Sequence, residues 1–133
     1  YHTINDIERI GDHAENIVEL AINKINNNIQ LSDEALKEVK EISKATLESV
    51  DIAIRCFKKR ESNDEIIVNE IEDRIDILEK NFRNNNIMRL NSRQCYANAG
   101  VMFFDLLSNL ERIGDHANNI ATVKENHVHR TYA

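Results

Sequence analysis

The chain has 133 residues, 41% hydrophobic and 30% charged, with a formal net charge of −6 at pH 7. It contains no proline and only three glycines, a composition typical of long uninterrupted helices. The acidic balance argues against nucleic acid as a partner, because phosphate binding requires a basic surface. No run approaches the roughly 18 apolar residues needed to span a bilayer. The two cysteines, Cys56 and Cys95, show no metal-ligand spacing. A disulfide between them is one alternative, but two isolated thiols in a helical chain are more typical of a reducing, cytosolic compartment.

The first predicted helix carries apolar residues at three- and four-residue intervals, a pattern that predicts one buried face. This stripe consists of Ile4, Ile7, Ile10, Ala14, Ile17, Ala21 and Ile25. The helix should end in the asparagine run 26–28, because asparagine side chains compete for backbone groups. A second helix is expected to begin with Ser32 as its N-cap. Its stripe consists of Leu36, Val39, Ile42, Thr46, Val50, Ala53 and Phe57.

Two further helices follow. Ser62 and Glu65 have the spacing of a capping box, and the third helix should end near residues 84–86. Its stripe consists of Ile67, Ile71, Ile75, Leu78 and Phe82. The fourth helix is predicted from Ser92 to Lys124, with an inward face of Ala99, Phe103, Leu106, Leu110, Ile113, Ala117 and Ile120. Short connections make neighbouring helices antiparallel, so the sequence predicts an all-α, up-and-down bundle of four long helices.

A seven-residue phrase occurs twice. Residues 8–14 and 111–117 both read Glu-Arg-Ile-Gly-Asp-His-Ala, each residue of the second copy lying 103 positions after its counterpart. The identity predicts a duplicated structural unit. The second copy closes a complete three-helix unit, residues 31–125, which a tail of residues 126–133 follows. The first copy, within residues 1–30, lacks two preceding helices, so we expect upstream helices or a partner chain, for instance in a homodimer, to cover it.

Acidic residues at four-residue spacing are the candidate site. Carboxylates so spaced lie one turn apart on the same helix face, and their repulsion costs roughly 0.2–0.5 kcal/mol per pair. A bound cation would reverse that sign, and helical bundles build metal sites from carboxylates on facing helices. The alternative is that each pair is only solvated surface. The three candidate pairs are Glu8 with Asp12, Glu72 with Asp76, and Glu111 with Asp115.

Neighbouring motif residues suggest supporting roles. Arg9 and Arg112 are expected to neutralise the acidic patches, either beside a metal site or as surface ion pairs. Gly11 and Gly114 each cost about 1 kcal/mol of helix propensity. Either a close helix–helix approach or a bulky metal cluster over the backbone would explain this cost, and we expect the close approach.

The histidines are weaker ligand candidates than the acidic residues, and the sequence shows no motif typical of a catalytic site. His13 and His116 lie about 100° around the helix from the motif aspartates, so we expect them on the polar surface. His127 and His129 fall in the tail, where they are weaker ligand candidates. No Gly-rich phosphate loop, nucleophile elbow or Cys/His pair is visible, which argues against an enzyme.

At these motifs the chain resembles the PhoU family. Residues 7–17 and 110–120 look like that family's characteristic helix, and residues 72–79 resemble its middle helix. The resemblance implies repeated three-helix units whose Glu-x-x-x-Asp motifs bind iron or zinc clusters. The ligands it implies are Glu8, Asp12, Glu111 and Asp115, with Glu72 and Asp76 facing the last pair. PhoU proteins usually contain two full units, so the cluster at the first motif is expected to be incomplete here.

The resemblance also implies a function. The family regulates phosphate uptake and signalling, and residues 2–8 and 106–111 look most like PhoU domains that follow the membrane part of bacterial sodium/phosphate cotransporters. We therefore expect a cytoplasmic regulatory domain tethered to the membrane, with the transporter segment of the same protein or a phosphate transport complex as its partner. One alternative is a soluble PhoU-type regulator. A different class would be a carboxylate-bridged metallohydrolase or metal-storage bundle.

Overall fold

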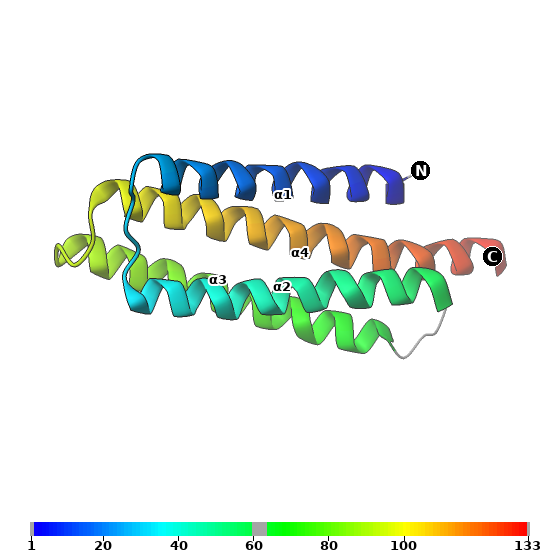
Figure 1. The fold of residues 1–133 in the computed structure, drawn as a ribbon. Coiled ribbons are helices and arrows are strands. Elements are labelled where there is room, and N and C mark those ends of the chain that lie inside the picture. Colours follow the sequence, from blue (N-terminus) through cyan, green and yellow to red (C-terminus); the bar gives the residue numbers. More distant parts are fainter. Residues whose placement is uncertain (1, 60–63, 133) are drawn as a thin grey trace.

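A computed structural model describes the backbone of residues 2–59 and 64–132, and the side chains of residues 3–58 and 66–122. Four helices follow one another: α1 (His2–Asn26), α2 (Asp33–Lys59), α3 (Asp64–Asn91) and α4 (Ala97–Tyr132). They form an antiparallel bundle with α1 on one side of α4 and with α2 and α3 on the other (Figure 1). Across the described ranges there is no strand, which confirms the predicted all-α fold.

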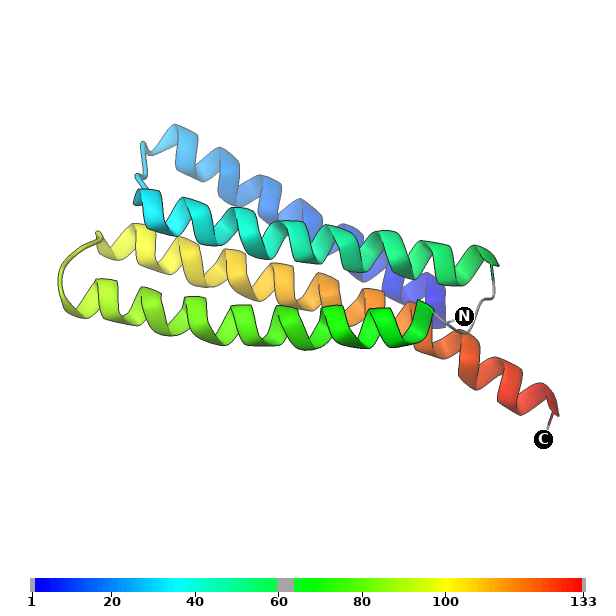
Figure 2. The same cartoon turned by 90° about the horizontal axis from the view of Figure 1, so that it is seen from below.

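Helix α4 is the centre of the molecule. It packs against all three other helices, and α2 also packs against α3 (Figure 2). Phe103 and Leu107 of α4 are fully buried and lie in one cluster with Ile42 of α2 and Phe82 of α3. Most of the predicted inward faces of the second, third and fourth helices therefore form the core. Leu36 and Phe57 of α2 and Ile67 of α3, which were also predicted to face inward, are 44%, 52% and 43% exposed, so the prediction was wrong at these positions near the helix ends.

The beginning of α2 follows the prediction. Ser32 Oγ accepts a hydrogen bond from the backbone N–H of Ala35 at 3.1 Å, the geometry of an N-cap. The predicted capping box of Ser62 and Glu65 lies outside the described side chains.

The junction between α3 and α4 differs from the prediction. Helix α3 continues through residues 84–86 to Asn91, and α4 begins at Ala97, not at Ser92. The reason is Asn86, whose buried Nδ2 donates to the carbonyl of Gly100 at 2.9 Å. An asparagine satisfied by the backbone of another helix does not compete for its own, so the helix runs on. At its other end α4 reaches Tyr132, past the predicted end at Lys124.

A buried ion pair joins α2 to α3. The side chain of Arg89 is 4% exposed, and its Nη2 lies 2.8 Å from Oε1 of Glu38, which is 8% exposed. Asn85 Nδ2 donates to the other oxygen of Glu38 at 2.7 Å. The Arg89 guanidinium also lies 5.0 Å from the ring centroid of Phe103. This network ties three helices together at the end of the bundle opposite the chain termini.

The predicted apolar stripe of α1 is not buried, which corrects the expectation for that helix. Ile4, Ile7 and Ile25 are 68%, 57% and 77% exposed. Within the described residues α1 packs only against α4, through Ile10, Ile17 and a set of polar residues. The face that α1 turns toward α4 therefore includes only Ile10 and Ile17 of the predicted stripe, and the other five stripe residues are exposed.

Candidate metal centre on the α3–α4 ridge

The two copies of the repeated motif meet at the α1–α4 interface. The rings of His13 and His116 stack with their centroids 5.7 Å apart. His13 Nδ1 lies 3.0 Å from Asn109 Oδ1, and His116 Nδ1 lies 2.9 Å from Asp6 Oδ1. Since Asn109 stands 103 positions after Asp6, as His116 does after His13, the two contacts are equivalent under the repeat.

The motif asparagines repeat this relation. Asn16 Nδ2 donates to Asn109 Oδ1 at 3.1 Å, and Asn119 Nδ2 donates to Asp6 Oδ1 at 3.4 Å. Antiparallel helices with such paired contacts are related by a pseudo-twofold axis that passes between them near the stacked histidines. The prediction of surface histidines was therefore wrong, since His13 is 9% exposed and forms part of this interface.

On α4 the acidic pair of the second motif copy faces α3. Electrostatic interactions link Glu111 to Glu79 and Asp76, and link Asp115 to Asp76 and Glu72. We call these five residues the carboxylate ridge. The predicted convergence of Glu72 and Asp76 with the last acidic pair is therefore present in the structure.

The ridge carries more negative charge than its surroundings balance. Partial burial, followed by the nearby carboxylates of Glu79, Asp115 and Asp76, raises the pKa of Glu111 to about 7. Burial and then Asp115 raise the pKa of Glu72. Burial and Asp76 raise the pKa of Asp115, whereas His116 and Arg112 act to lower it. The predicted neutralising role of Arg112 is consistent with this direction.

Glu79 is the ridge residue that sequence reasoning missed. Its carboxylate shares a hydrogen bond with Glu111, which contributes to the raised pKa of the latter. Arg83 Nε donates to Glu79 Oε1 at 2.5 Å, and Arg83 Nη2 donates to Ser108 Oγ at 3.2 Å. Glu79 follows Asp76 by three positions, so extending the acidic pair by one helical turn would have found it.

The donor chemistry of the ridge fits a cation. Carboxylate oxygens bind iron and zinc, and a positive charge would offset the repulsion that, together with burial, raises these pKa values. In the part of the chain that the structure describes, no group of three or more His, Cys, Asp or Glu side chains is arranged so that it could hold a metal ion. Ligation would therefore require partly exposed ridge carboxylates to change rotamer.

The first motif copy has no such ridge. Glu8, Arg9 and Asp12 are all exposed, and α1 has no neighbour but α4 among the described helices. A Cβ added at Gly11 would meet no atom within 4 Å, whereas one added at Gly114 would lie 3.2 Å from Cδ1 of Ile75. The predicted close approach is thus present at the second motif and absent at the first. The tail histidines His127 and His129 lie outside the described side chains.

The raised pKa of Glu111 predicts how stability depends on pH. Between pH 4.5, the ordinary value for glutamate, and about 7, the folded state holds more protons than the unfolded state. The free energy of unfolding should therefore fall as the pH rises through this window. Glu111→Gln keeps the side chain neutral, so the variant should exceed the wild type in stability at pH 8 by on the order of 1 kcal/mol, because partial exposure screens the repulsion.

Urea unfolding of both proteins at pH 4 and pH 8 measures this difference. The two should be nearly equal at pH 4, and Glu70→Gln, an exposed position on α3, should show no such pH-dependent gain. A Glu111→Gln variant that is less stable than the wild type at both pH values would show that the repulsion is absent.

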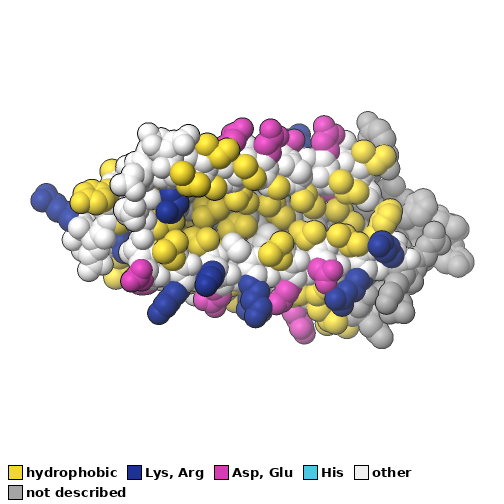
Figure 3. Space-filling model, in the orientation of Figure 1, with side chains coloured by type: hydrophobic (Ala, Val, Ile, Leu, Met, Phe, Trp, Pro, Cys, Tyr) yellow, Lys and Arg dark blue, Asp and Glu magenta, His cyan; other side chains and the backbone are white. Residues whose placement is uncertain are grey.

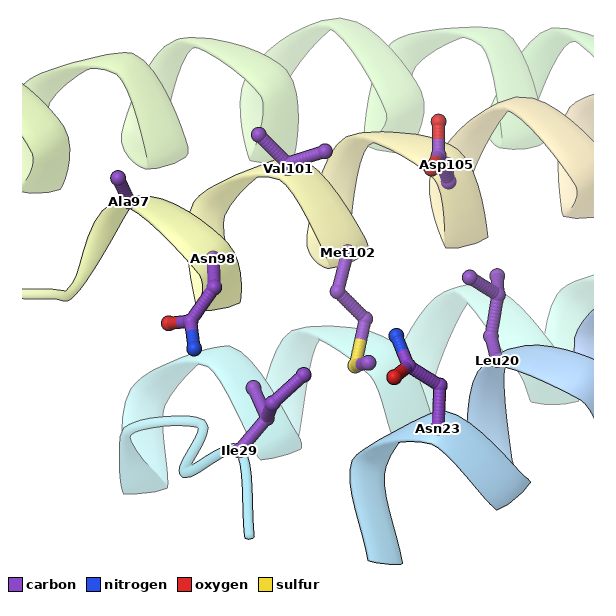
Figure 4. Close-up of a pocket in the computed structure, with 8 residues that line it drawn as sticks. All are labelled: Leu20, Asn23, Ile29, Ala97, Asn98, Val101, Met102 and Asp105. Atoms are coloured by element: carbon purple, nitrogen blue, oxygen red, sulfur yellow. The ribbon is translucent and has the colours of Figure 1, made fainter. Parts of the chain in front are cut away.

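A separate pocket lies where α1 ends beside the beginning of α4 (Figure 4). Its volume is about 330 Å³, and it lies apart from the ridge. The lining residues are Leu20, Asn23, Ile29, Ala97, Asn98, Val101, Met102 and Asp105. This lining includes no lysine, arginine or histidine, so it offers no positive charge to hold an anion such as phosphate.

Comparison with known proteins identifies the family. The family model described as the PhoU domain matches residues 39–123. A curated relative, the phosphate-specific transport system accessory protein PhoU homolog 1 of Thermotoga maritima, is 33% identical over 116 residues. That match covers 87% of this chain and 49% of the relative, so the chain spans about half of the relative's length. No solved structure matches the chain.

The helical architecture agrees with this match. The matched region covers most of the three-helix unit and includes every residue of the carboxylate ridge. None of the helices, over the residues described, is both long and apolar enough to cross a membrane. The chain belongs to the PhoU family.

Proposed function

We propose that this chain is a regulatory domain in phosphate transport and that the carboxylate ridge is its cation-binding element. Membership of the PhoU family and the name of the Thermotoga relative, an accessory protein of phosphate-specific transport, support the first part. The ridge itself carries the second part. It gathers five acidic side chains from two packed helices and raises the pKa of Glu111, Glu72 and Asp115.

The ridge residues have distinct tasks in this proposal. Glu111 and Asp115 of α4, with Glu72 and Asp76 of α3, would hold iron or zinc. The bound ion would supply the positive charge that the ridge lacks and would link α3 to α4. Glu79, which Arg83 fixes through a hydrogen bond, would position Glu111. Arg112 would limit the remaining negative charge near Asp115.

We further propose that the domain acts on the cytoplasmic side of the membrane, attached to a sodium/phosphate cotransporter. The likeness of residues 2–8 and 106–111 to PhoU domains of such transporters supports this placement. A soluble regulator that docks on a phosphate transport complex would use the same ridge. The full gene sequence separates the two, because the attached form requires membrane-spanning helices in the same polypeptide.

Phosphate uptake tests the function. The full-length protein is expressed in bacteria that lack their own PhoU and take up phosphate without control. Wild-type protein should lower uptake in phosphate-rich medium. The variant Glu111→Gln with Asp115→Asn should fail to do so at equal protein level, while Glu8→Gln with Asp12→Asn, the matched pair of the first motif, should act as wild type.

The outcomes separate the two parts of the proposal. If wild-type protein leaves uptake unchanged, the role in phosphate transport is refuted. If both double variants lower uptake as well as the wild type does, the role stands and the need for the ridge is refuted.

A further inference from the structure

A pocket lies between the two connections at the end of the bundle opposite the chain termini. Residues 27–32 join α1 to α2 and residues 92–96 join α3 to α4, and both connections lie at the left in Figure 1. The pocket between them has a volume of about 470 Å³. Its lining includes Gln30, Leu31 and Ser32 of the first connection and Arg93, Gln94 and Tyr96 of the second. None of these residues belongs to the carboxylate ridge, so the pocket is independent of the proposed cation site.

Arg93 occupies a position where glycine is the usual residue. Helix α3 ends in a Schellman motif, in which the N–H of Arg93 donates to the carbonyl of Leu90 at 3.2 Å. The N–H of Gln94 donates to the carbonyl of Arg89 at 2.8 Å in the same motif. This motif requires a left-handed residue, and the φ of Arg93 is 57°. A Cβ is disfavoured in that conformation, so stability alone would not select an arginine here.

The connection between α1 and α2 contains the same motif with a more usual residue. The N–H of Asn28 donates to the carbonyl of Ile25 at 3.4 Å, and the φ of Asn28 is 49°. Asparagine is favoured in this conformation because its short polar side chain can bond locally. Asn28 Oδ1 does so by accepting a hydrogen bond from Gln30 Nε2 at 2.9 Å. Within the described residues the Arg93 side chain makes no such bond, so the turn does not use its guanidinium.

The lining offers groups for an anion and for a flat polar ring. The guanidinium of Arg93 presents five N–H donors in a planar fork that matches a phosphate group. Ser32 Oγ already accepts a backbone hydrogen bond at 3.1 Å, which leaves its O–H free to donate to a ligand. Tyr96 is 78% exposed and provides an aromatic face on which a nucleobase can stack. The amides of Gln30 and Gln94 can hydrogen-bond to the edge of such a base.

The charges around the pocket limit the ligand to a single phosphate group. Among the described residues that line the pocket, only Arg93 carries a positive charge. Asp33 and Glu34 stand in the first turn of α2, and Glu34 lies 3.7 Å from the buried Arg89. The first turn of α4 contains no acidic residue. Figure 3 shows both basic and acidic side chains at this end of the molecule. A di- or triphosphate would therefore meet more repulsion than Arg93 can balance.

We propose that this pocket binds a nucleoside monophosphate. In this arrangement the phosphate lies against the Arg93 guanidinium and the hydroxyl of Ser32, and the base stacks on Tyr96. The volume supports an organic ligand, because small-molecule sites span about 300–1,000 Å³ and inorganic phosphate alone would leave most of the pocket unfilled. Such a ligand also accounts for an arginine at a left-handed position, since binding offsets the conformational strain there.

Equilibrium dialysis of the full 133-residue chain tests the proposal. The probes are the common nucleoside monophosphates, the corresponding uncharged nucleosides and inorganic phosphate. At least one monophosphate should bind, about tenfold or more tightly than its nucleoside, because the contact between Arg93 and the phosphate is charge-assisted. The same monophosphate should bind more tightly than inorganic phosphate, which cannot stack on Tyr96. Failure of every monophosphate to bind at millimolar concentration would overturn the proposal, as would equal affinity for the monophosphate and for inorganic phosphate.

Substitutions at Arg93 separate binding from folding. Arg93→Gln should weaken binding of the monophosphate by about tenfold or more and leave binding of the nucleoside unchanged, because it removes only the charge. Arg93→Gly should weaken binding as well, yet raise the urea midpoint of unfolding, because glycine adopts a φ of 57° without strain. Arg55→Gln removes the same charge near the other end of α2 and should bind as the wild type does.

Two results with these variants would contradict the proposal. If Arg93→Gln and Arg55→Gln weaken binding equally, the net charge of the chain determines binding and the pocket does not. If Arg93→Gly is less stable than the wild type, the arginine serves the fold and not a ligand.

Discussion

Replacement of Arg89 by alanine should destabilise the bundle by about 3–5 kcal/mol, the cost of leaving a buried charge without its partner. Glu38 is 8% exposed, and in the variant only the amide of Asn85 would remain to bond its carboxylate. The variant also loses the contact between the guanidinium and the ring of Phe103. Because these residues join α2, α3 and α4, the loss should lower the stability of the whole three-helix unit.

Urea unfolding followed by circular dichroism measures this effect. Glu34 provides the matched control, since it lies 3.7 Å from Arg89 but is 65% exposed. Glu34→Gln should change the free energy of unfolding by less than about 1 kcal/mol, as exposed ion pairs do. If Arg89→Ala and Glu34→Gln lower the free energy of unfolding by the same amount, the buried ion pair of Arg89 and Glu38 does not hold the three-helix unit together.

Removal of two charges from the carboxylate ridge should abolish most of its cation affinity. We expect Glu111→Gln with Asp115→Asn to weaken zinc or iron(II) binding by more than about tenfold, because changes even at supporting residues of metal sites cost that much. Ligation requires ionised carboxylates, and the pKa of Glu111 is raised to about 7. The affinity of the wild type should therefore fall as the pH is lowered from 8 toward 5.

Isothermal titration calorimetry measures both effects. Glu8→Gln with Asp12→Asn is the control, because the same residue types stand in the same motif on α1 without a facing acidic helix. That variant should bind as the wild type does. Equal loss of affinity in the two double variants would mean that net charge, and not the ridge, determines binding.

The three-helix unit could be predicted because most of its apolar periodicity is satisfied inside the chain. Ile42, Ile75, Phe103 and Ala117, all placed inward on sequence grounds, are at most 1% exposed. The phase of Glu72 and Asp76 relative to the inward face of α3 was likewise enough to place them opposite α4. In both cases the helix period alone fixes the direction of the side chain.

The periodicity of α1 could not show what covers that helix. Its apolar stripe is real, but only tertiary structure reveals that α1 meets α4 through Asp6 and His13 instead. The end of α3 was misplaced for a similar reason, because the acceptor for Asn86 lies on a different helix. Contacts between residues distant in sequence, such as Arg89 with Glu38, leave no periodic signal.

The position of a bound metal tests the central claim most directly. Crystals of the wild-type chain are soaked with zinc, and diffraction is recorded at wavelengths on either side of the zinc absorption edge. We predict an anomalous peak between α3 and α4, within bonding distance of Glu111 or Asp115 and of a ridge carboxylate of α3. A peak held only by residues outside the ridge, or no peak in crystals soaked at neutral to basic pH, would contradict the claim.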